Sequence, residues 1–127
     1  MSTELHLLGK PPFGQSLPGQ SVPEEYHLAP EKLLEGNPLQ QVWLDYTDAS
    51  GKFFAGTWRS EPGRWRIRYT EEEYCELLAG VSRVASDSGE VTTLHPGDRF
   101  VIPRGFSGTW EVMETTTKRF VIYEPGN

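Results

Sequence analysis

The sequence predicts an all-β protein built as one domain. Its 127 residues are enough to form a single hydrophobic core. The chain contains 13 Gly, 10 Pro and 4 Trp, with 36% apolar and 24% charged residues, a composition that suits short strands joined by tight turns. Beyond residue 40, apolar-rich runs of strand length follow one another at close intervals, which is typical of sandwiches and small barrels.

Residues 1–40 differ in composition from the rest and predict an extended N-terminal arm. Six prolines and four glycines lie in this segment, where they remove backbone donors and interrupt regular pairing. Residues 30–36 predict one or two helical turns, with proline at the start and glycine at the stop. The arm also carries seven large apolar side chains, so we expect it to pack on its own domain or on a partner subunit. These side chains are Leu5, Leu7, Leu8, Phe13, Val22, Tyr26 and Leu28.

Residues 41–127 predict the barrel itself. Turn-forming residues at 48–51, 61–63, 87–89 and 95–98 separate the apolar-rich runs. The predicted strands are residues 42–46, 53–59, 64–69, 74–78, 82–85, 91–94, 100–102, 109–113 and 119–123. From the residues alone, this pattern leaves a sandwich and a barrel open.

The charge of the chain limits its possible partners, and its cysteine content indicates its compartment. The net charge of -6 and the pI near 5.0, with no Lys/Arg run, argue against nucleic acid and anionic membranes. No apolar run approaches the roughly 20 residues of a membrane span. Cys75 is the only cysteine, so no intramolecular disulfide forms, and no secretion leader is recognisable. We expect a cytoplasmic protein.

A glycine, a proline and a glycine at Gly97, Pro103 and Gly105 have the spacing of the second cupin sequence signature. The chain therefore resembles a small single-domain cupin of the RmlC-like type. It is most similar to the group that includes (S)-ureidoglycine aminohydrolase and the ethanolamine-utilisation cupins. The resemblance implies a double-stranded β-helix, or jelly roll. Residues 63–65, 72–80, 97–105, 108–111 and 118–120 carry the similarity.

The same resemblance points to an unusual interior, because the histidines that usually bind metal in cupins are missing. Glu73 and Gly80 have the separation of the first signature and fix its register. The three histidine positions then fall on Ile67, Tyr69 and Gly108. A single carboxylate cannot hold a transition metal, which needs three or four convergent ligands. We expect no metal and no other cofactor.

Alternation along residues 64–69 predicts which side chains face inward. Trp65, Ile67 and Tyr69 share one face, and the three arginines between and before them share the other. An apolar interior costs less, so we favour an aromatic pocket. If the first signature is instead spaced one residue longer, Arg66 and Arg68 line the interior. The pocket would then be a cationic cleft for a carboxylate or phosphate.

Each candidate residue has a functional and a structural interpretation. Glu73 and Tyr69 are candidate acid–base groups, although Glu73 can also be a plain buried carboxylate. Lys118, with its neighbour Arg119, is a candidate anion ligand at the pocket mouth, or a surface residue paired with Glu111 or Glu114. The remaining candidates line the predicted pocket or simply fill the core. They are Trp65, Ile67, Cys75, Gly108 and Trp110.

Three function classes remain open at this point. The first is a metal-independent cupin that acts on or senses a small polar or carboxylated metabolite. The second is a metal-dependent enzyme with atypical ligands, for example Glu73, Tyr69, Cys75 and a water. The third is a non-catalytic sensor or structural module with a filled barrel. We favour the first, and expect a small-molecule ligand and a homodimer in which the arm contributes to the interface.

Overall fold

The computed structural model describes residues 4–8 and 22–126. Within these ranges the chain forms nine strands and one short 3-10 helix, with no α-helix. None of the described residues forms a helix of the length and apolarity needed to cross a membrane. The strands are β1 (Glu24–Tyr26), β2 (Leu33–Glu35), β3 (Gln40–Thr47), β4 (Phe53–Ser60), β5 (Gly63–Arg68), β6 (Glu72–Ser86), β7 (Val91–Leu94), β8 (Arg99–Ile102) and β9 (Ser107–Tyr123).

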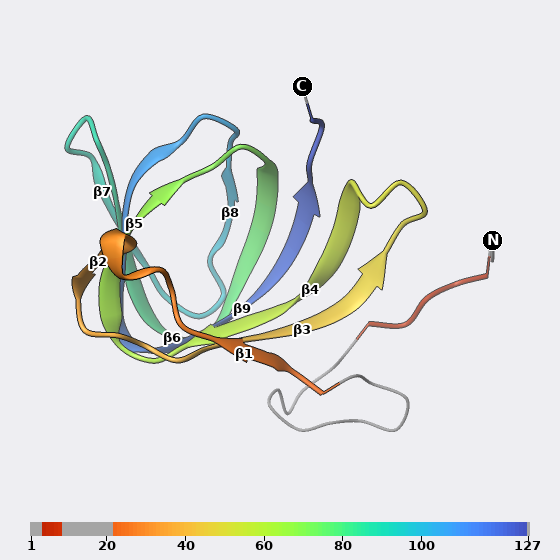
Figure 1. Cartoon of the computed structure of the whole chain (residues 1–127), viewed down its shortest axis with the longest axis horizontal. Coiled ribbons are helices and arrows are strands. Elements are labelled where there is room, and N and C mark those ends of the chain that lie inside the picture. Colours follow the sequence, from red (N-terminus) through yellow and green to blue (C-terminus); the bar gives the residue numbers. More distant parts are fainter. Residues whose placement is uncertain (1–3, 9–21, 127) are drawn as a thin grey trace.

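The sheet curls around two long antiparallel strands, β6 and β9, which pair from Glu72 opposite Tyr123 to Ser86 opposite Gly108. The other edge of β9 is shared by β4 and β5, and the other edge of β6 by β7 and β8. Figure 1 shows the strands wrapped around the interior of the barrel. The predicted all-β jelly roll is confirmed.

A bulge in β6 explains why two predicted strands are one. The sequence predicts a break between residues 78 and 82, where the register of β6 against β9 shifts three times. Gly80 lies there with φ +86°, a conformation that L side chains rarely adopt. A Cβ at Gly80 would meet the carbonyl oxygen of Thr115. The bulge changes which residues face inward, from Leu77 before it to Ser82 after it.

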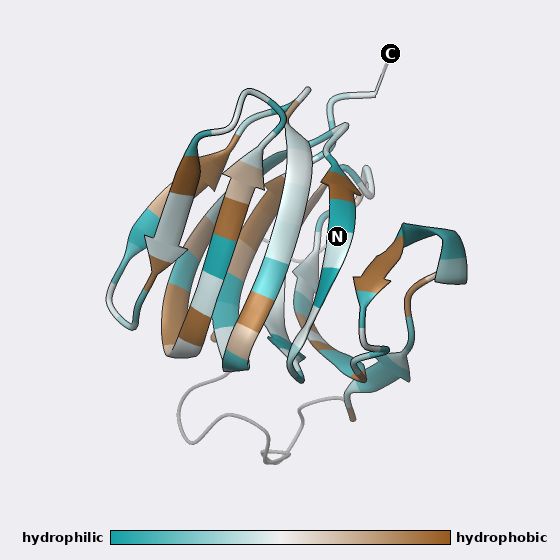
Figure 2. Ribbon diagram, turned by 90° about the vertical axis from the view of Figure 1, so that its left-hand side faces the viewer, coloured by the Kyte–Doolittle hydropathy of each residue, from teal (hydrophilic) through white to brown (hydrophobic). Residues whose placement is uncertain are grey.

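Strand β9 also joins two predicted strands, and its even-numbered side chains are buried on both sides of an interruption at Glu114, which is exposed. Most of its even-numbered residues are buried, from Trp110 and Val112 to Lys118 and Phe120. Hydrophobic and hydrophilic residues alternate along the neighbouring strands as well (Figure 2). The core cluster therefore draws on strands from both halves of the barrel, with Trp58, Trp65 and Trp110 at its centre.

Part of the predicted arm belongs to the sheet. Strand β1 pairs with β3, and β2 pairs with β5 at Trp65 and Arg64. The predicted helical turns at residues 30–36 are only partly present. The 3-10 helix η1 covers Pro30–Lys32, after which Leu33–Glu35 is extended because it pairs with β5. The predicted packing of Phe13 lies outside the described residues.

Candidate ligand-binding site

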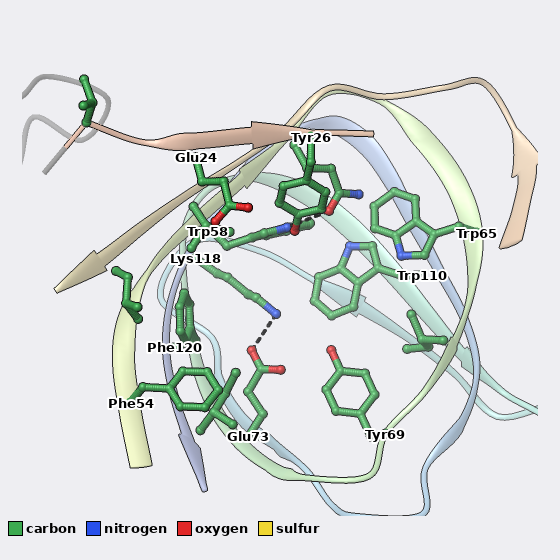
Figure 3. A pocket seen from close by; sticks show the side chains of 16 residues that line it. Glu24, Tyr26, Phe54, Trp58, Trp65, Tyr69, Glu73, Trp110, Lys118 and Phe120 are labelled. Atoms are coloured by element: carbon green, nitrogen blue, oxygen red, sulfur yellow. Dashed lines mark hydrogen bonds and ion pairs between the residues drawn. The ribbon is translucent and has the colours of Figure 1, made fainter. Parts of the chain in front are cut away.

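A cavity of about 530 Å³ lies inside the barrel. Strands β1, β3, β4, β5, β6 and β9 all contribute side chains to its wall. The lining is mostly aromatic and aliphatic, with a few polar groups that converge from different strands (Figure 3). Cavities of this size and character are typical of small-molecule sites.

The polar centre of the cavity is an ion pair between Lys118 of β9 and Glu73 of β6. Lys118 Nζ lies 2.8 Å from Glu73 Oε2, and the two side chains are only 7% and 5% exposed. Burial alone would lower the pKa of Lys118, but the combined effect of Glu73, Tyr69 and Cys75 outweighs burial, and the pKa is raised. The cavity therefore holds a fixed ammonium–carboxylate pair.

Two tryptophan rings enclose the lysine. Lys118 Nζ lies 4.9 Å from the ring centroid of Trp58 and 4.7 Å from that of Trp110, within cation–π range. The indole N–H of Trp58 donates to Gln40 Oε1 at 3.0 Å, and that of Trp110 donates to Ser82 Oγ at 3.1 Å. These hydrogen bonds fix the orientation of both rings, so the lysine is held in place by rigid neighbours.

Tyr69 and Cys75 surround the carboxylate with neutral donors. Burial raises the pKa of the Tyr69 phenol, and it raises the pKa of the Cys75 thiol to about 12. Lys118 opposes both shifts and Glu73 adds to them. The thiol donates to Glu73 Oε2 at 3.3 Å, and the Tyr69 hydroxyl points toward the same carboxylate (Figure 3). Both groups keep their protons near neutral pH.

The arm provides one wall of the cavity. Glu24 and Tyr26 of β1 project over it from the side opposite Glu73 and Tyr69 (Figure 3). Burial raises the pKa of Tyr26, although a hydrogen bond with Trp58 acts in the other direction. Strand β1 is thus part of the site, in addition to being an edge of the sheet.

The structure brings six of the eight sequence-predicted site residues to this cavity. Cys75 is fully buried directly behind the Glu73 carboxylate and does not line the cavity. Gly108 does not line it either. The six residues that do are Trp65, Ile67, Tyr69, Glu73, Trp110 and Lys118.

Gly108 lies in a second groove, of about 380 Å³, beside β5. A Cβ at this position would meet the carbonyl oxygen of Ala85 on the paired strand β6, so the missing side chain allows close strand pairing. Gly108 therefore serves strand pairing and does not line the central cavity, contrary to our expectation. Arg66 and Arg68 are exposed and line this same groove with Lys32. The inward face of β5 is therefore Trp65, Ile67 and Tyr69.

Lys118 lies deeper than either interpretation of the sequence anticipated. It is buried at the cavity centre, and neither Glu111 nor Glu114 is its partner. Glu111 faces Arg83 at 3.7 Å, while the neighbouring Arg119 faces outward to Glu76 at 3.5 Å. The continuity of β9 is the reason, because residue 118 shares the buried face with Trp110.

Several cavity residues were not identified from the sequence. They are Tyr26, Gln40, Phe54, Trp58 and Phe120, with aliphatic neighbours from β3 and β9. One signal was available: continuing the alternation of β9 from Trp110 reaches Lys118 and Phe120. Trp58 lies opposite Lys118 on β4. That pairing joins segments about sixty residues apart, which local patterns do not reveal.

The residues at the expected metal positions do not fit a metal ion. Ile67 and Gly108 offer no ligand atom, and the Glu73 carboxylate is already neutralised by the Lys118 ammonium. Among the residues that the structure describes, no group of three or more His, Cys, Asp or Glu side chains converges. We derive no chemistry through a metal from this donor set.

The comparison with protein families gives one match. A family model described as the EutQ-like cupin domain matches residues 47–120. That range includes β5 to β8 and most of β9, and with them Tyr69, Glu73 and Lys118. No curated protein matches the chain.

Solved structures with the same fold include two ethanolamine utilization proteins. A putative ethanolamine utilization protein Q from Salmonella typhimurium superposes with a TM-score of 0.61 at 16% identity, covering 82% of this chain and 97% of that one. The EutQ protein of Clostridium difficile gives 0.62 at 15% identity, covering 76% and 79%. These likenesses concern the fold.

A protein of unknown function from Pseudomonas syringae pv. tomato gives a TM-score of 0.73 at 16% identity. The superposition covers 80% of this chain but 44% of the Pseudomonas protein. The present chain thus spans less than half the length of that protein.

Proposed function

Because the chain belongs to the EutQ-like cupin family, we propose that its barrel binds a small polar metabolite in the central cavity and does so without a metal ion. The observation that carries the proposal is the aromatic cavity of about 530 Å³ with the Lys118–Glu73 pair at its centre. Small-molecule sites combine apolar walls with a few convergent polar groups in this way.

The polar groups have complementary roles in this proposal. Lys118 donates hydrogen bonds to the ligand, and the Glu73 carboxylate accepts hydrogen bonds from the ligand. Tyr69 keeps its proton because burial raises its pKa, so it acts as a donor. If the bound molecule is also converted, Tyr69 and Glu73 are the groups placed to give and take a proton. Trp110 and the neighbouring rings form the apolar wall.

The cavity also weighs against a purely structural barrel. A module whose interior is simply filled leaves no space of ligand size, since protein cores pack at the density of organic crystals. A cavity of about 530 Å³ is within the range of about 300–1,000 Å³ typical of ligand sites. We therefore favour a binding role over the filled-barrel alternative.

A cavity-filling variant tests the proposal. In wild-type protein, a panel of small polar metabolites screened by thermal shift and then by calorimetry should contain at least one binder. Ile67→Trp should abolish that binding, because Ile67 lines the cavity. Arg66→Trp is the matched control, since the adjacent side chain is exposed and should leave binding unchanged. Absence of any binder, or equal binding by both variants, would contradict the proposal.

Metal independence is tested separately by elemental analysis. Protein purified without a histidine tag or chelator should contain no transition metal in near-stoichiometric amount, with or without Glu73→Gln. A metal near one per chain that is lost in Glu73→Gln would overturn this part of the proposal. It would also place metal chemistry at Glu73.

We also propose a homodimer in the cytoplasm as the working form. Residues 5–8 support an interface role for the arm, because Leu5 and Leu7 are largely exposed and His6 packs edge-on against Tyr46 at 4.9 Å. The single cysteine is buried and free, as suits a reducing compartment. Nucleic acid is not an expected partner at a net charge of -6.

A further inference from the structure

The charged side chains of the cavity disfavour anionic ligands. Lys118 is its cationic side chain among the described lining residues, and Glu73 already neutralises it at 2.8 Å. Glu24 adds a second carboxylate on the β1 side. Glu24 is exposed, so water screens its charge. A carboxylate ligand would have to compete with Glu73 for the ammonium of Lys118.

Cationic ligands are disfavoured for a different reason. Aromatic cavities bind cations through ring faces, but Lys118 Nζ already lies over the rings of Trp58 and Trp110 at 4.9 and 4.7 Å. A second cation beside these rings would be repelled by the buried ammonium at short range. Together, the two arguments leave a ligand without net charge.

The ion pair also presents a hydrogen-bonding pattern to the ligand. An ammonium has three N–H donors, and a carboxylate has about four acceptor sites. Lys118 and Glu73 contact each other, and Glu73 also accepts from Cys75 and Tyr69. These contacts leave donors and acceptors of the pair unused. A donor and an acceptor thus lie side by side, 2.8 Å apart, facing the cavity (Figure 3). The complement of this pattern is a carbonyl oxygen directly beside an N–H.

The walls add a constraint of shape. Trp65, Trp110 and Tyr69 line the cavity with rigid rings, and the indole N–H of Trp110 is already bonded to Ser82. Such walls offer apolar faces and edges and few further polar contacts. A flat molecule that meets the ion pair along one edge and the rings along its faces would match both features.

We propose that the ligand is a neutral, planar molecule with a cis-amide edge, in which C=O accepts from Lys118 and the adjacent N–H donates to Glu73. Lactams, cyclic ureas and many oxo-substituted heterocycles belong to this class. The inference rests on the proposed function, because it specifies what the same cavity binds. It narrows the small polar or carboxylated metabolite expected from the sequence to a neutral polar one.

Four matched probes test it by calorimetry and by amide chemical-shift changes at the cavity residues. 2-Pyridone carries the full edge, and 1-methyl-2-pyridone has a methyl group in place of the N–H hydrogen. Benzoate is anionic and N-methylpyridinium is cationic. We expect 2-pyridone to bind in the cavity at least tenfold more tightly than each of the others, the approximate effect of one lost hydrogen bond. Equal or tighter binding of the N-methylated or charged probes overturns the inference.

Variants link the preference to the ion pair. Glu73→Leu with Lys118→Met removes both charges together, which avoids leaving one buried charge without a partner, and it also removes the acceptor at residue 73. In this double variant 2-pyridone should lose its advantage over 1-methyl-2-pyridone. Arg119→Gln, on the outer face of the same strand, should retain it. Thermal unfolding of both variants verifies that they are folded, and a retained advantage in the folded double variant contradicts the inference.

The two proposals fail in different ways. Cavity binding of benzoate or N-methylpyridinium with no preference for 2-pyridone refutes the neutral ligand but preserves a binding cavity. If neither these probes nor any member of the metabolite panel binds in the cavity, both the ligand class and the proposed function are wrong.

Discussion

At the scale of single residues, the buried pair of Lys118 and Glu73 is the feature with the largest energetic consequence. Each charge is stabilised by the other at 2.8 Å in a place where water barely reaches. Replacing such a pair by apolar side chains is often tolerated, whereas removing one partner leaves a buried charge uncompensated. The pair therefore makes the two positions strongly interdependent.

We predict that Lys118→Met and Glu73→Gln each lower the free energy of unfolding by about 3–5 kcal/mol, because each leaves its former partner charged and buried. The double variant should lose less than the sum of the two, with a coupling of about 0.5–3 kcal/mol. Urea unfolding of the four proteins in a double-mutant cycle measures this. Strictly additive effects would show that the two side chains do not interact in solution.

A second prediction at this scale concerns alkaline pH. Cys75, Tyr69 and Lys118 have raised pKa values in the folded state, from 9.0 to about 12 for the thiol. Between the unfolded and folded pKa values the folded state binds more protons, so stability falls as pH rises. We expect the free energy of unfolding to decline from about pH 9 upward, by at most about 1.4 kcal/mol per pH unit for each group.

The thiol contribution can be isolated from the other two. Cys75→Ser removes the thiol, which titrates near pH 9 in the unfolded chain, so the decline of its stability between pH 9 and pH 10 should be shallower than that of the wild type. Denaturant titrations at pH 8, 9, 10 and 11 provide the comparison. A wild-type stability that stays constant up to pH 11 would contradict the prediction.

At the scale of elements, the bulge of β6 determines which of its side chains face the interior on each side of Gly80. Gly80 has φ +86°, and the backbone of Thr115 on β9 lies against it. The bulge reverses the inward face between Leu77 and Ser82, so Ser82 can accept the hydrogen bond of Trp110. Without this reversal, Trp110 would lose the partner that orients it.

We predict that Gly80→Ala destabilises the protein clearly more than Gly51→Ala. Both glycines have positive φ, +86° and +73°, so both substitutions carry the conformational cost of about 1 kcal/mol or more. Only Gly80 also meets neighbouring backbone, whereas a Cβ at Gly51 has open space within 4 Å. Chemical denaturation of the two variants decides the comparison. Equal losses would mean that β9 moves aside without cost.

The elements also show where sequence reasoning succeeds and where it stops. Alternation placed Trp65, Ile67 and Tyr69 on one face, because on β5 the residue pattern and the pleat agree. The same reasoning predicted two strands where the structure has β6 alone. A glycine within a strand can mark an end or a bulge, and the bulge at Gly80 depends on its contact with Thr115 of a distant strand. The signature glycine spacing gave the fold through resemblance, and the structure has that fold.

The candidate site divides in the same way. Glu73 and Tyr69 could be predicted because the register of one signature fixes their positions. The burial of Lys118 follows from the alternation that begins at Trp110 only if β9 is continuous through residues 114–118, and the predicted strands ended at residue 113. Tyr26 could not be placed at all, because β1 reaches the cavity only through its pairing with β3. Contacts between distant segments are invisible to local periodicity.

At the scale of the whole molecule, the arm is structural as well as peripheral. Strand β1 covers an edge of β3, and β2 covers part of an edge of β5. Uncovered edges offer unpaired backbone groups to other chains and promote aggregation. Residues 24–35 therefore protect the sheet and also close one side of the cavity.

We predict that deletion of residues 1–40 leaves a monomeric or aggregating protein. The deletion exposes the edges of β3 and β5 and removes Tyr26 from the cavity wall. Analytical ultracentrifugation compares the full chain with the deletion variant, and the full chain should sediment as a dimer. A clean, soluble dimer of the deletion variant would show that the arm is not needed for association.

The position of β9 has a further consequence for the order in which the chain acquires its structure. Strands β4, β5 and β6 all pair with β9, which is the last strand along the described chain. During synthesis the β3–β4 and β6–β7 hairpins can form early, but they share no partner until residues 107–123 leave the ribosome. Barrel closure therefore waits for the last described strand and is dominated by distant pairings, which fold slowly. The nascent chain presents unpaired strand edges throughout that interval, and for that time it is a natural client for chaperones.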